Sequence, residues 1–62
     1  MLAHLVPAGS TFEREGQRFT LLRHHRARKG RVLIAYRREG GGVGMQELAD
    51  TDRLDVVEVP TP

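Results

Sequence analysis

The side chains with the clearest chemical potential in this 62-residue sequence are the cations between Gly16 and Arg38. This stretch has no carboxylate and holds eight basic residues: Arg18, Arg23, Arg26, Arg28, Lys29, Arg31, Arg37 and Arg38. Closely spaced cations neutralise several phosphates and release counterions, and arginine can form paired hydrogen bonds to a phosphate or to guanine. The stretch therefore predicts nucleic-acid binding through phosphate contacts, with limited base readout.

The densest part of this stretch, Arg23 to Arg31, is compatible with two other roles. It could bind an acidic protein surface, or it could be a solvated loop that keeps a hydrophobic hairpin soluble. The sequence has only three aromatic residues, one Tyr and two Phe, and we expect all three in the core. A platform for stacking single-stranded bases is then undersupplied, which favours duplex or phosphate binding over binding to single strands. DNA rather than RNA is the expected nucleic-acid partner.

Catalytic and metal-binding constellations are not found in the sequence. Cysteine is absent and Ser10 is the only serine, so no nucleophile–base pair is evident. His24 and His25 are adjacent, and neighbouring residues on a strand point to opposite faces, so they do not suit one metal ion. We therefore expect no enzyme activity and no cofactor or metal. The glycines at 40–42 and 44 indicate a turn, because neither a helix nor a Lys-Ser/Thr pair follows them.

Charge is distributed unevenly along the chain. Residues 1–38 have nine basic residues and two glutamates, a net charge of +7, whereas residues 39–62 have one arginine and six acids, a net charge of −5. Such asymmetry indicates a face that binds polyanions, pairing between the two halves, or both. A protein-interaction role is the alternative function: a phage- or plasmid-type module that binds and modulates a host protein. An exposed apolar patch containing Leu22, Leu33 or Val57 would favour it.

The elements that must position the cations are short strands. Residues 18–24 alternate, with Phe19 and Leu21 on one face, and residues 31–38 place Val32, Ile34 and Tyr36 on one face. Residues 25–30 between them are expected to be a loop or the flared end of a hairpin, with Gly30 in the turn. The full set of predicted elements is a first strand or arm over 1–7, strands over 11–14, 18–24, 31–38, 43–45 and 54–59, and a 3-10 turn over 46–50.

Regular strand spacing of this kind predicts an all-β fold, a small five- to six-stranded barrel with one short 3-10 turn before the last strand. The pattern resembles SH3-like small β-barrels and is loosely similar to the barrel domains of Mu-type transposases and integrases, which bind DNA. The resemblance implies a DNA-binding barrel. It depends on turn and core positions: Gly9, Phe12, Gly16, Phe19, Leu21, Val32, Ile34 and the run Glu47-Leu48-Ala49.

The length predicts a single domain over 1–62, with residues 60–62 as a frayed tail. No apolar run is long enough to span a membrane, and the N-terminus does not have the pattern of a secretory signal, so a cytoplasmic protein is expected. A chain this short buries only about 60% of its unfolded surface. With no cysteines for disulfides, a homodimer is an expected source of additional buried area.

Overall fold

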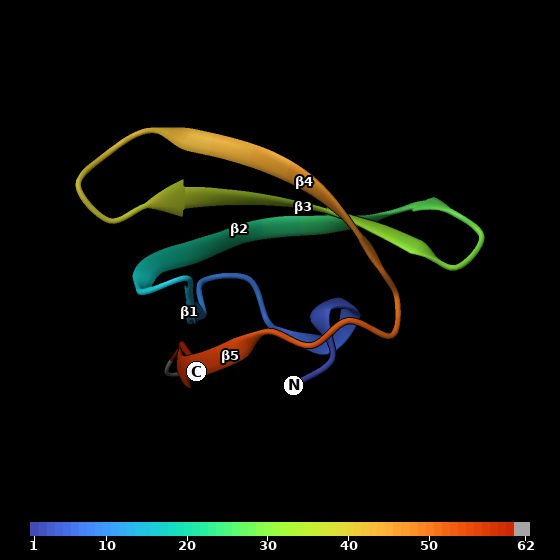
Figure 1. Ribbon diagram of the computed structural model, residues 1–62, viewed down its shortest axis with the longest axis horizontal. Coiled ribbons are helices and arrows are strands. Elements are labelled where there is room, and N and C mark those ends of the chain that lie inside the picture. Colours follow the sequence, from blue (N-terminus) through green and yellow to red (C-terminus); the bar gives the residue numbers. More distant parts are fainter. Residues whose placement is uncertain (61–62) are drawn as a thin grey trace.

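The chain forms one antiparallel β-sheet of five strands, as seen in a computed structural model that describes residues 1–60 (Figure 1). A 3-10 turn, η1, comes first. The elements are η1 (Ala3–Leu5), β1 (Thr11–Arg14), β2 (Gln17–Arg28), β3 (Arg31–Arg38), β4 (Val43–Ala49) and β5 (Asp55–Glu58). The all-β prediction is confirmed.

Strands β1 to β4 follow one another as a meander, and β5 returns to pair with β1, so the sheet order is β4-β3-β2-β1-β5. The β1–β2 turn consists of Glu15 and Gly16, whose φ angles are 54° and 77°. Two successive residues with positive φ are typical of the tight turns whose twist matches that of a hairpin. Within residues 1–60, β4 pairs only with β3 and β5 only with β1, so both ends of the sheet are unpaired edges.

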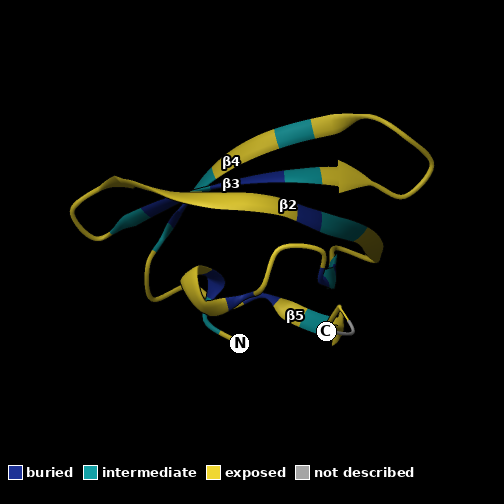
Figure 2. Cartoon of the chain, turned by 180° about the vertical axis from the view of Figure 1, so that it is seen from behind, coloured by how far each residue is buried: buried dark blue, intermediate teal, exposed yellow. Residues whose placement is uncertain are grey.

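The sheet curls so that β1, β5 and η1 lie on one side of the β2–β3–β4 portion (Figure 1). We call the sheet face turned toward η1 the inner face and the opposite face the outer face. The core fills the inner face, where buried segments of the strands meet buried residues near η1 (Figure 2). Its members are Ala3, Val6, Phe12, Leu21, Val32, Ile34, Leu48 and Leu54. Phe19, Tyr36 and Val56 are partly buried and pack against this core.

Three predicted elements differ from the structure. Residues 46–50 were expected to form a 3-10 turn, but β4 continues to Ala49 because Gln46, Glu47 and Leu48 pair with β3. The 3-10 turn is instead η1, near the N-terminus, where a first strand or an ordered arm was predicted; there Leu2 makes only an isolated bridge to Arg53. Residues 25–30, expected to be a loop or the flared end of a hairpin, are mostly strand, since β2 extends to Arg28.

The ends of the chain add two points. The predicted fraying of residues 60–62 concerns mainly Thr61 and Pro62, which lie outside the described residues. Over residues 1–60, none of the helical structure has the length and apolar character needed to cross a membrane.

Candidate nucleic-acid interface

The cations of β2 are sorted between the two faces by two irregularities in its pairing with β3. Leu21 lies opposite Tyr36 and Arg23 lies opposite Ala35, so one extra residue is inserted at Leu22. A second shift inserts Ala27 between Arg26 and Arg28. Each extra residue is a β-bulge, which changes the phase of the side chains that follow it.

The outer face therefore receives most of the cations predicted to bind nucleic acid. Residues opposite one another in a ladder share a face. Arg37 lies opposite Thr20, Arg23 opposite Ala35 and Arg28 opposite Arg31, all on the outer face. With Arg18, which is beside Glu13 on β1, five arginines follow the outer face of the β2–β3 hairpin. Arg18 and Arg28 are ten steps apart along the chain, so at about 3.3 Å per residue they are separated by roughly 30 Å, close to the 32 Å long axis of the molecule.

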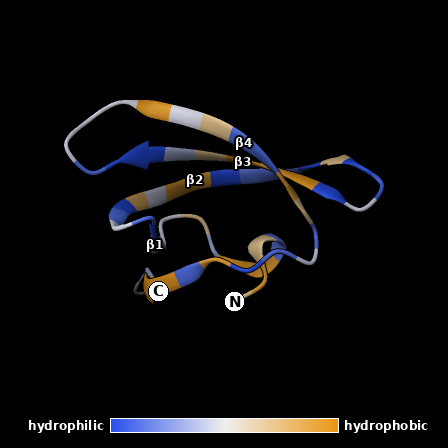
Figure 3. Ribbon diagram, in the orientation of Figure 1, coloured by the Kyte–Doolittle hydropathy of each residue, from blue (hydrophilic) through white to orange (hydrophobic). Residues whose placement is uncertain are grey.

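The remaining three predicted site residues lie elsewhere. Arg26, opposite the buried Val32, and Arg38, opposite Phe19, belong to the inner face. Lys29 is in the β2–β3 turn, at the end of the hairpin (Figure 1). Six of the eight cations thus belong together: five arginines form an outer-face stripe, and Lys29 lies at its end. The two inward arginines, Arg26 and Arg38, are separate from this stripe. Hydropathy colouring shows the hydrophilic character of this end of the hairpin (Figure 3).

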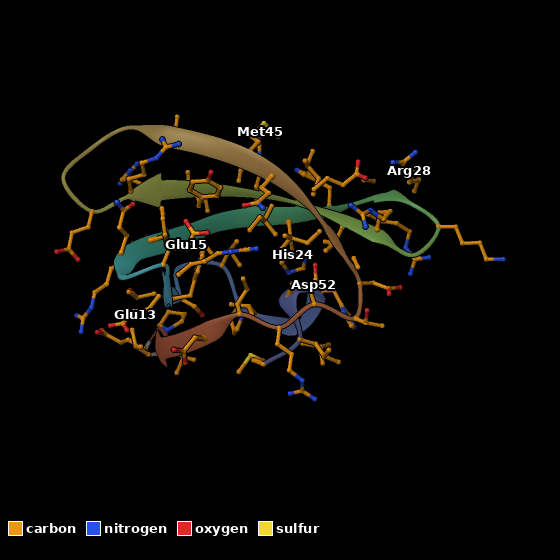
Figure 4. All side chains as sticks on the ribbon, in the orientation of Figure 1. Glu13, Glu15, His24, Arg28, Met45 and Asp52 are labelled. Atoms are coloured by element: carbon orange, nitrogen blue, oxygen red, sulfur yellow. The ribbon has the colours of Figure 1, made fainter. Side chains whose placement is uncertain are left out.

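Two arginines at the hairpin end of the stripe converge on one carboxylate. The Glu47 Oε1 atom accepts hydrogen bonds from Arg31 Nε at 2.9 Å and Arg28 Nη2 at 3.0 Å. Hydrogen bonds from the Arg31 and Arg28 guanidinium groups hold the pKa of Glu47 below its usual value. This pairing fixes the two guanidinium groups beside the turn, where Figure 4 shows Arg28. Their charge is partly compensated, so they contribute less to the outer field than unpaired arginines would.

Arg18 and Arg38 also have partners. Arg18 Nε donates to Glu13 Oε1 at 3.1 Å, an exposed ion pair of the kind that contributes little to stability. Arg38 donates to the Val43 carbonyl at 3.1 Å, and its guanidinium lies 5.4 Å from the Tyr36 ring centroid. Arg38 is therefore oriented by β4 and by an aromatic face.

Four of the eight cations have neither an ion pair nor a side-chain hydrogen bond within residues 1–60: Arg23, Arg26, Lys29 and Arg37. Arg23 and Arg37 belong to the outer-face stripe and Lys29 to the turn at its end. These three are the most available to an anionic ligand. The acidic residues Asp55 and Glu58 lie on β5, at the far edge of the sheet order, and Glu58 lines a hollow together with Arg18, Arg37 and Glu39.

The histidines do not form a metal site in the described part of the chain. His24 lies opposite Ile34 and His25 opposite Leu33, which places the two rings on opposite faces as expected. His24 shares an inner-face hollow with His4, Arg26 and Asp50. Between residues 1 and 60, no group of three potential ligands has metal-binding geometry.

Sequence reasoning missed an aromatic cluster at the opposite end of the inner face. Phe12 and Phe19 are stacked with ring centroids 5.3 Å apart, and Tyr36 meets Phe19 edge-on at 5.2 Å. Phe12 is buried, while Phe19 and Tyr36 are partly exposed in a hollow that also includes Arg14 and Arg38. The Tyr36 ring packs over Gly44, where a side chain would meet the ring. The glycine at this strand position is the sequence signal that could have located the aromatic cluster.

A second missed feature is apolar and lies on the outer face. Leu22, Ala35, Val43 and Met45 line a shallow hollow beside Arg23. Val43 is 64% exposed and Met45 57% exposed, although both belong to a regular strand. Figure 4 shows Met45 pointing away from the core. The outer face of the sheet thus combines a basic stripe on β2 and β3 with an apolar region that reaches the β4 edge.

Comparison with known proteins gives no further guide: no family model matches the chain, and no curated protein or solved structure matches it significantly. The likeness to SH3-like barrels stays a prediction.

Proposed function

We propose that the chain binds nucleic acid, duplex DNA in preference to RNA, through the outer face of the β2–β3 hairpin. The observation that carries this proposal is the alignment of five arginines along one face, with Lys29 at the end of the row. Glu13 and Glu47 pair with stripe arginines, and Glu39 and Glu58 line a hollow with Arg18 and Arg37, so six cations against these four carboxylates leave this surface a net charge of +2. No enzyme activity is part of the proposal.

Arg23, Arg37 and Lys29 would supply the primary phosphate contacts, because they have no carboxylate partner within residues 1–60. Arg28 and Arg31 would add a second group of donors held in place by Glu47. Side chains on a rigid sheet lose less freedom on binding than side chains on a loop. The binding mode would be phosphate contact over the length of the hairpin, which positions a duplex without specifying its sequence.

The salt dependence of DNA binding tests this mechanism. With about four phosphates neutralised, the slope of log K against log salt should be about −3.6, a loss of about 150-fold in affinity between 50 and 200 mM salt. The variant Arg23→Ala/Arg37→Ala should reduce the slope to about −1.8, because two of those contacts are removed. A mobility-shift or fluorescence-anisotropy titration with a short duplex at several salt concentrations measures both slopes.

The matched control is Arg14→Ala/Arg53→Ala. Both residues are exposed and lie outside the outer-face stripe, and their replacement removes the same total charge. The control should leave the slope unchanged. If it reduces the slope as much as the stripe variant does, binding depends on net charge alone; if the wild type fails to bind DNA or RNA at low salt, the proposal is wrong.

The second candidate is a module that binds and modulates another protein. Leu22 and Val57 are partly exposed, and Leu22 lines the outer-face apolar hollow. Two substitutions with aspartate separate the candidates: Leu22→Asp, which adds a charge, would abolish an apolar protein contact, whereas Arg37→Asp, which reverses a charge, would chiefly weaken phosphate contacts. Low-salt titrations against duplex DNA, single-stranded DNA and RNA that all fail would favour the protein-binding candidate.

A further inference from the structure

The strand β4 has a hydrogen-bonding edge with no strand partner among the described residues. Two side chains reach this edge: Arg38 Nη1 donates to the Val43 carbonyl at 3.1 Å, and Asp52 Oδ2 accepts from the Ala49 N–H at 3.1 Å. The Arg38 N–H donates to the Gly42 carbonyl at 2.8 Å, and the Asp50 N–H donates to the Gly30 carbonyl at 2.9 Å. In an antiparallel ladder the bonded residues alternate, so Gly44, Gln46 and Leu48 face β3. The N–H and C=O groups of Val43, Met45 and Glu47 therefore point away from the sheet.

This edge does not have the features that usually discourage pairing. Natural edge strands are commonly protected by Lys, Pro, a bulge or a very short length. β4 is seven residues long, its pairing with β3 is regular, and it contains neither Lys nor Pro. Its two outer-face residues nearest the open end, Val43 and Met45, are exposed and apolar. Such an edge favours the addition of another strand.

We propose that the β4 edge pairs antiparallel with the β4 edge of a second copy of this chain, about a two-fold axis at Met45. Met45 then faces its counterpart, and Val43 faces Glu47 of the second copy. The N–H and C=O groups of Val43, Met45 and Glu47 in each strand are used, for about six interchain hydrogen bonds. The Val43 carbonyl, which already accepts from Arg38, accepts the interchain bond through its second lone pair. This inference goes beyond the proposed function and does not depend on it.

The register follows from which backbone groups are available. An outward residue pairs only with another outward residue, so a two-fold axis can pass through Gly44, Met45 or Gln46. An axis at Gln46 would require the Ala49 N–H, which already donates to Asp52 Oδ2 at 3.1 Å. An axis at Gly44 would leave Glu47 unpaired. The axis at Met45 satisfies Val43, Met45 and Glu47 together and leaves the Ala49–Asp52 bond intact.

The side chains on both faces are compatible with this register. On the outer face, the two Met45 side chains join the two apolar hollows that include Leu22 and Ala35 into one covered region. On the inner face, Gly44 lies opposite Gln46 of the second copy, so no bulky pair meets there. Arg37 has no carboxylate partner within residues 1–60 and lies beside Val43. It is two strand spacings, about 10 Å, from Glu47 of the second copy, within range of a favourable charge interaction.

A second copy also accounts for stability. A 62-residue chain without cysteine has a thin core, and strand pairing between copies extends one sheet across two chains. The two-fold arrangement uses each β4 edge once and closes the assembly at two copies. It also places two basic outer-face stripes on one continuous surface.

Equilibrium sedimentation over a dilution series of the full chain tests the proposal. The wild type should approach twice the 7.0 kDa chain mass. Met45→Pro should be monomeric, since it removes an N–H that bonds only across the edge, and proline is tolerated where the N–H of an edge strand faces outward. Met45→Lys should also be monomeric and leaves the backbone of each chain unaltered. Val57→Lys, on the opposite edge strand β5, should remain dimeric.

Amide hydrogen exchange provides an independent readout. Gly44, Gln46 and Leu48 should be protected in every folded state, because they bond to β3. Met45 and Glu47 should be protected at high concentration and lose protection on dilution. A wild type that is monomeric throughout, a dimer or larger oligomer that persists in both Met45 variants, or rapid exchange of Met45 and Glu47 at every concentration would overturn the proposal.

Discussion

Replacing Gly44 by alanine tests the packing of the aromatic cluster. A Cβ atom at Gly44 would lie 2.8 Å from the Tyr36 Oη atom and 2.9 Å from two carbons of its ring. Gly44 is not among the residues with positive φ, so the backbone itself accepts alanine. The ring has little room to move, because it meets Phe19 edge-on and carries the Arg38 guanidinium over its face.

Two opposing contributions determine the size of the effect. Overpacking of this kind costs about 1–3 kcal/mol. Restricting the unfolded chain by replacing glycine with alanine contributes about 0.4–1 kcal/mol of stability. The clash is larger, so Gly44→Ala should destabilise the fold by about 1.5 kcal/mol and lower Tm by about 6–12 °C.

A double-mutant cycle with Tyr36→Leu isolates the clash, because leucine retains an apolar side chain but has no ring over Gly44. In that background Gly44→Ala should be stabilising by about 0.5 kcal/mol, since only the unfolded-state contribution is left. Urea or thermal unfolding followed by circular dichroism, at one fixed protein concentration, measures all four proteins. If Gly44→Ala destabilises both backgrounds equally, or neither, the assigned role of the Tyr36 ring is wrong.

Three further predictions concern single sites. Glu47 has a lowered pKa in the folded chain because Arg31 and Arg28 donate to it, so its stabilising contribution should be full above the ordinary pKa of 4.5 and be lost as pH falls through the lower folded value. Urea unfolding of Glu47→Gln and wild type should therefore differ at pH 7 and converge in strong acid; an equal difference at both pH values would contradict this. Ser10 is fully buried and its hydroxyl has no partner within residues 1–60, so Ser10→Ala should raise stability by up to about 1 kcal/mol, and a clear fall in Tm would refute this. Phe12→Ala should cost about 3–5 kcal/mol, against the roughly 3–9 kcal/mol expected of a chain this size, and leave much of the protein unfolded by circular dichroism at 25 °C; a cooperative transition near that of the wild type would show that Phe12 is not central to the core.

Alternation of apolar residues was sufficient to predict the strands at the centre of the fold. Val32 and Ile34 are buried as expected, and so are Phe12 and Leu21, because a period of two directly reports which face of a strand is covered. Tyr36 packs on the core while its outer part lies in a hollow. These are the positions where local sequence and burial agree.

The extent of β4 could not be predicted from local sequence. Residues 46–49 have helix-forming composition, yet a preference spread over a few residues is weak, and pairing of the whole segment with β3 overrides it. The choice between a loop and the flared end of a hairpin for residues 25–30 could not be made for a related reason: polar residues gave no signal of a strand, although their backbone groups pair with β3. Pairing partners, which determine both elements, are distant in sequence.

The bulges in β2 explain why the predicted site was right in its composition but not in its geometry. Strict alternation from Phe19 and Leu21 would carry Arg23 and His25 to the inner face. The extra residue at Leu22 places Arg23 outward beside it and His25 outward after it, while His24 and Arg26 turn inward. The extra residue at Ala27 then brings Arg28 to the side of Arg31, where both reach Glu47. A period-two pattern has no marker for an inserted residue, so the charge of the outer face is set by pairing geometry that only the folded sheet reveals.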